Sequence, residues 1–324
     1  MLCPPPSVWR SAVTSELLVS PPMALRCWKA RKLSAPLRAN GHCPVGSAAG
    51  SWVADNGRVI EFDPEILDFY QQGKEASRLT SPERHPGPLE FVRTQELITR
   101  YLPQGSLRII DVGGGPGHYS RWLSDLGHDV RLIDPVPLHV VQARAMGIRA
   151  DIGDARRLDQ ATESVDVVVM LGPLYHLRDR AERVQTLSES LRVVRPGGVV
   201  FAAAISRFAA LLDLLVRLDR LDEPPVFEAV ATALGSGEFG GGDSGLFTNA
   251  YFHRPEELRR EAQEAGLRDI HVFNIEGPGF LVDNFQERWA DPIRRDALVE
   301  AARLIEEDRD MLGCASHLLV VAMK

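Results

Sequence analysis

A glycine-rich run is the feature of this 324-residue sequence that most directly indicates chemistry. Asp111-Val112-Gly113-Gly114-Gly115-Pro116-Gly117 places an acid two residues ahead of alternating glycines at Gly113, Gly115 and Gly117. Glycines let the backbone turn tightly and approach a ligand without side-chain obstruction. An apolar run precedes the glycines and a helical pattern follows them, so we predict a ligand-binding loop rather than an ordinary turn.

The register of the glycines separates two classes of cofactor. A dinucleotide site requires G-x-G-x-x-G, so that a pyrophosphate lies at the helix N-terminus. Counted from Gly113 and Gly115, the third glycine would fall at position 118, which is His118. The loop therefore fits a nicotinamide or flavin cofactor poorly.

Two further aspartates follow the next predicted strands. Asp134 lies 21 residues after Gly113, where a strand-end carboxylate can accept two hydrogen bonds from a ribose diol. The alternative is a solvated strand-end aspartate, and the glycine loop favours the ribose role. Asp154 stands in Gly153-Asp154-Ala155, a combination that ordinary turns also use.

The segment Leu171-Gly172-Pro173-Leu174-Tyr175-His176-Leu177 follows the fourth predicted strand. Active sites of open α/β sheets lie just beyond the carboxyl ends of strands. Imidazole accepts a proton near neutral pH, so His176 is our first choice for a general base, together with Tyr175. The alternative is that Tyr175 packs in the core and His176 caps the following helix.

Alternating strand and helix patterns predict the elements that position these residues. Strands are expected at 107–112, 129–133, near 148, 165–170, 198–204, 270–275 and 317–322. Helices are expected at 64–70, 89–101, 119–126, 178–194, 208–221 and 255–266. This alternation indicates βαβ units and a parallel sheet.

The acid-x-Gly-x-Gly-x-Gly run, followed in order by Asp134 and Asp154, resembles the class I S-adenosylmethionine-dependent methyltransferases through most of residues 60–324. The resemblance implies that the loop wraps the amino-acid end of S-adenosylmethionine, with Asp111 at the family's acidic position. It also implies that Asp154 accepts from the adenine amino group, that the Ala155 N–H meets a ring nitrogen, and that Leu171 lies beside the cofactor.

The Gly-Pro-Leu-Tyr-His stretch is similar to that of bacterial small-molecule methyltransferases. The Asn/Asp-Pro-Pro-Tyr signature of enzymes that methylate adenine or glutamine nitrogens is absent. Those relatives also carry an arginine-containing helical N-terminal element, matched here by Tyr70 and Arg78, and a Tyr-Phe-His run, matched by residues 251–253. The resemblance implies that Tyr70, Arg78 and His253 line the substrate pocket.

On this basis we expect an α/β fold, a Rossmann-like seven-stranded, mostly parallel sheet with helices on both faces and the last strand antiparallel. Residues 53–324 would form the methyltransferase domain. A helical lid would come from residues 53–101 and from insertions at 205–250 and 276–315.

Residues 1–52 differ from the rest of the chain. They are rich in Pro, Ser and Ala and hold six basic side chains and one acid. We expect a disordered extension, the alternative being an organelle transit peptide. The whole chain carries −7, so residues 53–324 carry −12, which disfavours nucleic acid as a substrate.

Other patterns narrow the class of protein. No apolar run approaches a membrane span, and neither the four cysteines nor any His/Asp/Glu spacing indicates a metal site, so we expect a cytoplasmic protein without a metal. The predicted function is methyl transfer by direct displacement to N, O or C of a small molecule, natural products included. The alternative is a non-catalytic S-adenosylmethionine-binding protein that acts through a partner protein. No pattern indicates a particular acceptor or oligomeric state.

Overall fold

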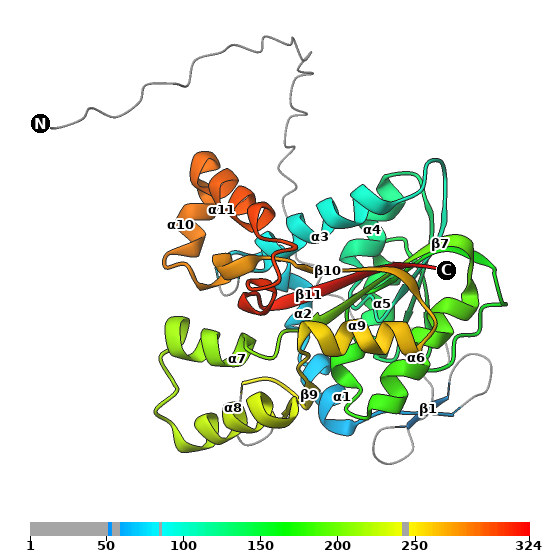
Figure 1. Cartoon of the computed structure of the whole chain (residues 1–324). Coiled ribbons are helices and arrows are strands. Elements are labelled where there is room, and N and C mark those ends of the chain that lie inside the picture. Colours follow the sequence, from blue (N-terminus) through cyan, green and yellow to red (C-terminus); the bar gives the residue numbers. More distant parts are fainter. Residues whose placement is uncertain (1–50, 54–58, 84–85, 242–245) are drawn as a thin grey trace, which may run out of the picture. The chain divides into compact units, whose positions relative to one another are not determined.

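The computed structural model describes residues 51–53, 59–83, 86–241 and 246–324 (Figure 1). The extension expected at 1–52 therefore lies outside the described residues, apart from its last two positions. No helix within the described ranges is long and apolar enough to cross a membrane.

A seven-stranded sheet forms the centre of the structure, with strand order β10-β11-β7-β6-β3-β4-β5. Its strands are β3 (Arg108–Val112), β4 (Asp129–Asp134), β5 (Arg149–Ile152), β6 (Val165–Met170), β7 (Val194–Ile205), β10 (Arg268–Asn274) and β11 (His317–Met323). Strands β3 to β7 pair in parallel, whereas β11 runs antiparallel to both β7 and β10. The predicted fold, including the antiparallel last strand, is confirmed.

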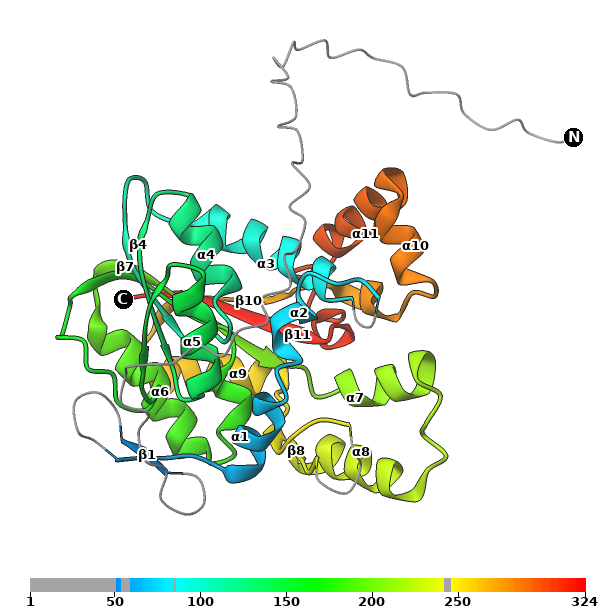
Figure 2. The ribbon, with the colours of Figure 1, turned by 180° about the vertical axis from the view of Figure 1, so that it is seen from behind.

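Helices cover both faces of the sheet because its central strands are apolar on both sides. All six residues of β6 are buried. One face packs against α3 (Gly87–Tyr101) and α4 (His118–Asp125), through Leu97 and Leu123. The other packs against α6 (Arg180–Val193) and α9 (Pro255–Glu264), through Leu187 and Leu258. These layers are visible in Figures 1 and 2.

One helix next to the sheet was not expected from the sequence. Helix α5 (Pro137–Ala145) connects β4 to β5 and packs Val140 and Ala143 against the sheet. The two prolines at its start are typical of a loop. A proline is nevertheless tolerated at the first helical position, because the helix leaves the N–H of that residue unpaired in any case.

The N-terminal segment contributes a short hairpin of β1 (Ser51–Val53) and β2 (Val59–Glu61), followed by α1 (Pro64–Gln71), α2 (Glu75–Arg78) and α3. The Asp63 carboxylate caps α1 by accepting from the Glu65 N–H. Helices α1 and α2 lie near the carboxyl ends of the strands, where a lid was expected.

Both expected insertions contain helices and lie toward the same end of the molecule (Figures 1 and 2). The first holds α7 (Ala209–Leu212), a π-helical turn (Asp213–Arg217), α8 (Pro224–Ser236), β8 (Glu238–Phe239) and β9 (Ala250–Tyr251). The second holds α10 (Phe285–Ala290) and α11 (Pro292–Leu304) between short 3₁₀ turns. The single helix expected at 208–221 is therefore shorter and ends in the π turn.

Candidate active site

A cavity enclosing about 920 Å³, part of it open to solvent, lies beyond the carboxyl ends of β3, β4, β5 and β6. It is lined by all but one of the residues expected to bind the cofactor: Asp111, Gly113, Gly115, Asp134, Asp154, Ala155 and Leu171. The structure thus brings together residues that are spread over some sixty positions of the sequence.

The exception is Gly117, which begins α4 with a φ of 96°. A Cβ there would lie 3.2 Å from Cβ of Ala143, so this glycine permits close packing on α5 rather than contact with a ligand. Gly113 and Gly115 also have positive φ values, of 66° and 57°. A Cβ on Gly113 would lie 2.6 Å from Pro173, so the turn requires glycine.

Asp111 is buried at the end of β3 with one oxygen unpaired. Ser120 Oγ donates to Oδ2 at 2.7 Å, whereas Oδ1 has no hydrogen-bond partner. Burial raises the pKa of this carboxyl group to about 7, against the hydrogen bonds from Ser120. A cationic ligand in the cavity would favour the ionised form.

Asp134 holds the glycine loop and α5 together. Its carboxylate accepts from the N–H groups of Gly115 at 2.9 Å and Val136 at 2.8 Å. Nδ1 of His139 lies 3.1 Å from Oδ1 of the same group. Asp134, which we expect to bind the ribose, therefore also has a structural role.

Asp154 lines the cavity, but its carboxylate is paired within the chain. The Arg156 guanidinium donates to it over 2.8–3.0 Å and also contacts Glu182. An adenine amino group would have to share this carboxylate with Arg156.

Three observations indicate that S-adenosylmethionine fits this cavity. The glycine loop turns at residues that admit no side chain, a buried carboxylate oxygen of Asp111 is unpaired, and acids follow three successive strands. The cofactor carries a sulfonium and an ammonium group, and acidic residues suit both.

Tyr70 and His176 meet at the wall of this cavity. The Tyr70 hydroxyl and Nε2 of His176 are hydrogen-bonded at 2.7 Å, and Nδ1 of His176 has no hydrogen-bond partner. Burial lowers the pKa of His176 to about 4, and burial raises the pKa of Tyr70 well above its usual range. The His176 imidazole therefore stays neutral in moderate acid, and its role as a general base stays a prediction.

The alternative roles given above were packing in the core for Tyr175 and capping of the next helix for His176. His176 ends a 3₁₀ turn (Pro173–His176) and does not cap α6, which is capped by Asp179. The Tyr175 hydroxyl donates to the Leu171 carbonyl at 3.3 Å, and the ring is largely buried, although it lines the cavity.

A second, larger cavity of about 2,200 Å³, again partly open to solvent, adjoins the first. The two share a wall made of Tyr70, Glu75, Arg78 and Tyr175. Much of the second cavity is apolar, with walls from α1 and the first insertion: Phe69, Ile205, Ala209, Ala210, Leu214, Leu218, Phe239, Leu246, Phe247 and Phe252. Such a space suits an apolar or aromatic molecule.

Arg78 lines both cavities, as expected of a substrate-pocket residue, but its charge is neutralised. Glu75 accepts from its Nε at 2.7 Å, and Glu90 accepts from both terminal nitrogens at 2.5 and 3.1 Å. The guanidinium therefore does not indicate an anionic acceptor.

A cluster of Glu90, Glu276 and His317 lies beside Arg78 and was missed in the sequence. Nδ1 of His317 lies 2.5 Å from Glu276 and 3.7 Å from Glu90, and His317 lines the second cavity. Burial opposes protonation of His317, but the two carboxylates outweigh it and raise its pKa. Among the residues that the structure describes, these three form the group whose possible ligand atoms lie close enough together to hold a metal ion. Arg78 and His317 already balance the carboxylates, so we interpret the cluster as an ion-pair network.

His253 does not line either cavity, contrary to the expectation from the Tyr-Phe-His run. It is fully buried, and its Nε2 lies 3.2 Å from Glu261. The run begins at the last residue of β9, and the contact with Glu261 places the His253 ring against α9.

The comparisons with known proteins agree with this geometry. A family described as "Methyltransferase domain" matches residues 109–198, which run from β3 to the start of β7. A ubiquinone biosynthesis O-methyltransferase of Agrobacterium fabrum is 28% identical over 63% of this chain and 77% of that protein. One from a Methylobacterium species is 30% identical over 51% of this chain but 61% of its own length.

Two solved structures share the fold. A methyltransferase of Thermotoga maritima, described as a possible histamine N-methyltransferase, is 16% identical with a TM-score of 0.52. The match covers 80% of this chain and 98% of that one. A phosphoethanolamine N-methyltransferase of Haemonchus contortus, bound to S-adenosylhomocysteine, is 18% identical with a TM-score of 0.51, over 82% of this chain and 62% of that one. These two structures show a shared fold, and the family match over residues 109–198 and the two O-methyltransferases, together with the glycine loop and its three aspartates, support a class I S-adenosylmethionine-dependent methyltransferase.

Proposed function

We propose that the protein methylates a small aromatic molecule on a hydroxyl oxygen, in the second cavity. The observation that carries this proposal is the wall shared by the two cavities, at Tyr70, Glu75, Arg78 and Tyr175. A cofactor in the first cavity and an acceptor in the second would face each other there. Transfer to oxygen is further supported by the names of the two bacterial relatives, and an aromatic acceptor by the phenylalanine-rich walls.

S-Adenosylmethionine supplies a methyl group on a positively charged sulfur, which the acceptor oxygen displaces. The chain's contribution is largely alignment in a space that excludes water. Burial keeps Tyr70 and His176 neutral, and their hydrogen bond fixes both side chains against the first cavity. Asp111, Asp134, Asp154, Ala155 and Leu171 would hold the cofactor. Tyr175 would contact both bound molecules.

We propose His317 as the residue that takes the hydroxyl proton. A general base works best when its pKa lies near the working pH, and the lowered pKa of His176 makes it a weak base. His317 lines the acceptor cavity, and Glu276 orients its ring through Nδ1. Its Nε2 has no hydrogen-bond partner among the described residues, so the deprotonated ring can accept there.

The experiment is methyl transfer from labelled S-adenosylmethionine to an extract separated into a fraction below about 1 kDa and a macromolecular fraction. Label in the small-molecule fraction, with equimolar S-adenosylhomocysteine, is expected. Label on macromolecules would overturn the substrate class, as nucleic acid or protein would then be the acceptor. Cofactor binding without transfer to either fraction would favour a non-catalytic protein that acts through a partner. The acidic body supports a cytoplasmic enzyme, and the second cavity supports a small-molecule acceptor.

A further inference from the structure

We propose that Arg183, clamped by Glu261 of α9, is a positioning residue that fixes the Tyr175–His176 segment. This inference rests on the proposed function, because that segment forms the wall between the cavities. The Nη1 group of Arg183 donates to the carbonyls of Leu177 at 2.9 Å and Arg178 at 2.8 Å. These are the first two residues after His176, so the guanidinium holds the end of the 3₁₀ turn.

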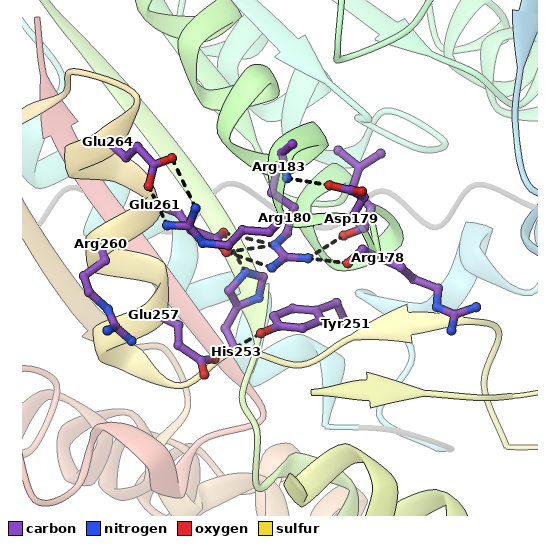
Figure 3. Close-up of polar contacts among 12 residues, drawn as sticks. Arg178, Asp179, Arg180, Arg183, Tyr251, His253, Glu257, Arg260, Glu261 and Glu264 are labelled. Carbon is purple, nitrogen blue, oxygen red and sulfur yellow. Dashed lines mark hydrogen bonds and ion pairs between the residues drawn. The ribbon is translucent and has the colours of Figure 1, made fainter. Parts of the chain in front are cut away.

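The guanidinium is itself held on its other sides, as Figure 3 shows. Nε and Nη2 donate to the Glu261 carboxylate over 2.8–3.1 Å, which is a bidentate pair. The ring of Tyr251 lies 3.6 Å from the guanidinium carbon. A planar fork with fixed partners on both sides leaves Arg183 little freedom.

The Tyr-Phe-His run explains why Glu261 stays in place. Its His253 has a pKa lowered by burial, so the ring is neutral, and its Nε2 lies 3.2 Å from Glu261. A carboxylate accepts hydrogen bonds, so Nε2 carries the proton. His253 is therefore a second support for the carboxylate that clamps Arg183.

A second arginine anchors the same run. Arg207 donates to the Phe252 carbonyl at 2.7 Å and to the Tyr251 hydroxyl at 3.2 Å, and it pairs with Glu257 of α9. The run is thus tied to β7 at one end and to α9 along its length. Arg183 and Glu261 are both buried, which is unusual for charged groups without a role, and the neutral His253 is buried beside them.

Burial alone could reflect a contribution to folding, so the test separates the two roles. In Arg183→Lys, an ammonium group replaces the fork and cannot reach Glu261 and both carbonyls together. In Arg183→Met/Glu261→Leu, both buried charges are removed, so no unpaired charge is left to destabilise the fold. A matched control is Arg180→Met/Glu264→Leu, which removes the exposed ion pair between the same two helices (Figure 3).

Three quantities are measured on each variant: melting temperature, dissociation constant for S-adenosylhomocysteine, and hydrogen–deuterium exchange of the peptide spanning 171–179. Turnover with the labelled small-molecule fraction is added where the wild type transfers label. We expect exchange at 173–178 to rise at least tenfold in Arg183→Lys and in the double variant, with turnover at least tenfold lower. The melting temperature of the double variant should lie closer to that of the wild type than that of Arg183→Lys does. Cofactor affinity should stay within threefold of wild type in both Arg183 variants, and the control should match wild type in every measurement.

Wild-type exchange at 173–178 in both Arg183 variants would overturn the proposal, whatever happens to melting temperature. Exchange that rises uniformly over the whole chain, as in a globally destabilised protein, would also overturn it. The exchange result needs no methyl acceptor. Failure of the proposed function, seen as no transfer by the wild type, is therefore distinguishable from failure of this inference.

Discussion

The Tyr70 hydroxyl, on helix α1, lies 2.7 Å from Nε2 of His176, which is 106 residues later in the chain. This hydrogen bond joins helix α1 to the segment that follows β6. The start of the same helix is held by Asn249, whose amide donates to Asp63 at 3.2 Å and Glu65 at 2.8 Å. Helix α1 is therefore held both by the turn after β6 and by the segment before β9.

Removing the Tyr70 hydroxyl should impair turnover more than cofactor binding. In Tyr70→Phe the ring remains, but Nε2 of His176 loses its partner, and a lost hydrogen bond of about 1 kcal/mol corresponds to roughly a fivefold effect. We expect turnover to fall about five- to twentyfold and the dissociation constant for S-adenosylhomocysteine to change less than threefold. Tyr101→Phe, outside both cavities, is the control. Equal losses of affinity and turnover would assign Tyr70 to the cofactor.

The pH dependence of turnover should follow His317 rather than His176. The pKa of His317 is raised by Glu90 and Glu276, against burial and the nearby Arg78, so its basic form is lost as pH falls through a value above 6.5. His176 remains neutral down to about pH 4. Turnover of the wild type should therefore decline as the pH falls through that raised pKa, and His317→Gln should be ~10²-fold slower without this decline. A wild-type profile that is flat from pH 8 to 5 would remove His317 from the mechanism.

Replacing Asp134 should weaken cofactor binding and also cost stability. Its carboxylate accepts from two backbone N–H groups, so Asp134→Ala should lower the free energy of unfolding by about 1–3 kcal/mol. In Asp134→Asn the amide oxygen can still accept from one of these two donors while the charge is lost, so this variant should lose less stability than Asp134→Ala. Titration calorimetry with S-adenosylhomocysteine should show affinity roughly ten- to a hundredfold lower in both variants. Unchanged affinity in the folded Asn variant would contradict the ribose assignment.

Asp111 should make the ligand-free protein less stable at high pH. Its pKa is raised to about 7 in the folded state from 3.8 when exposed, so the folded state binds the proton more tightly. Stability is therefore lost as pH rises from about 4 through 7, by on the order of 2–4 kcal/mol. Asp111→Asn should melt at a higher temperature than wild type at pH 8 and at a similar one near pH 4, while binding cofactor more weakly at pH 8. A variant less stable than wild type at pH 8 would show that the carboxylate is stabilised.

Local sequence patterns predicted the site residues that lie at the carboxyl ends of individual strands. Asp111 and Asp134 follow apolar residues of their strands, Asp154 follows the short third strand, and parallel strands bring their carboxyl ends to one edge. The sheet and most helices next to it followed from the same alternation. Helix α5 was missed because its prolines and weak apolar periodicity resemble a loop.

Contacts between distant segments were not predictable in this way. His317 meets Glu90 and Glu276 across 227 and 41 residues, and no local pattern records that meeting. The pKa of His176 depends on burial by neighbours such as Tyr70 and Phe247, which come from the lid and the first insertion. The Tyr-Phe-His run was noticed, but its ring direction depends on how β9 meets α9, so His253 was assigned to the wrong side.

If cofactor and acceptor occupy adjacent cavities, filling the second cavity should block methyl transfer and leave cofactor binding intact. Ala210 lines the second cavity on α7, whereas Ala231 is exposed on α8 and lines neither. Wild type, Ala210→Trp and Ala231→Trp are compared for S-adenosylhomocysteine affinity and for label transferred to the small-molecule fraction. We expect Ala210→Trp to keep its affinity within threefold and to lose more than nine-tenths of the transfer, while Ala231→Trp matches wild type. Full transfer by a folded Ala210→Trp protein would show that the acceptor does not bind in the second cavity.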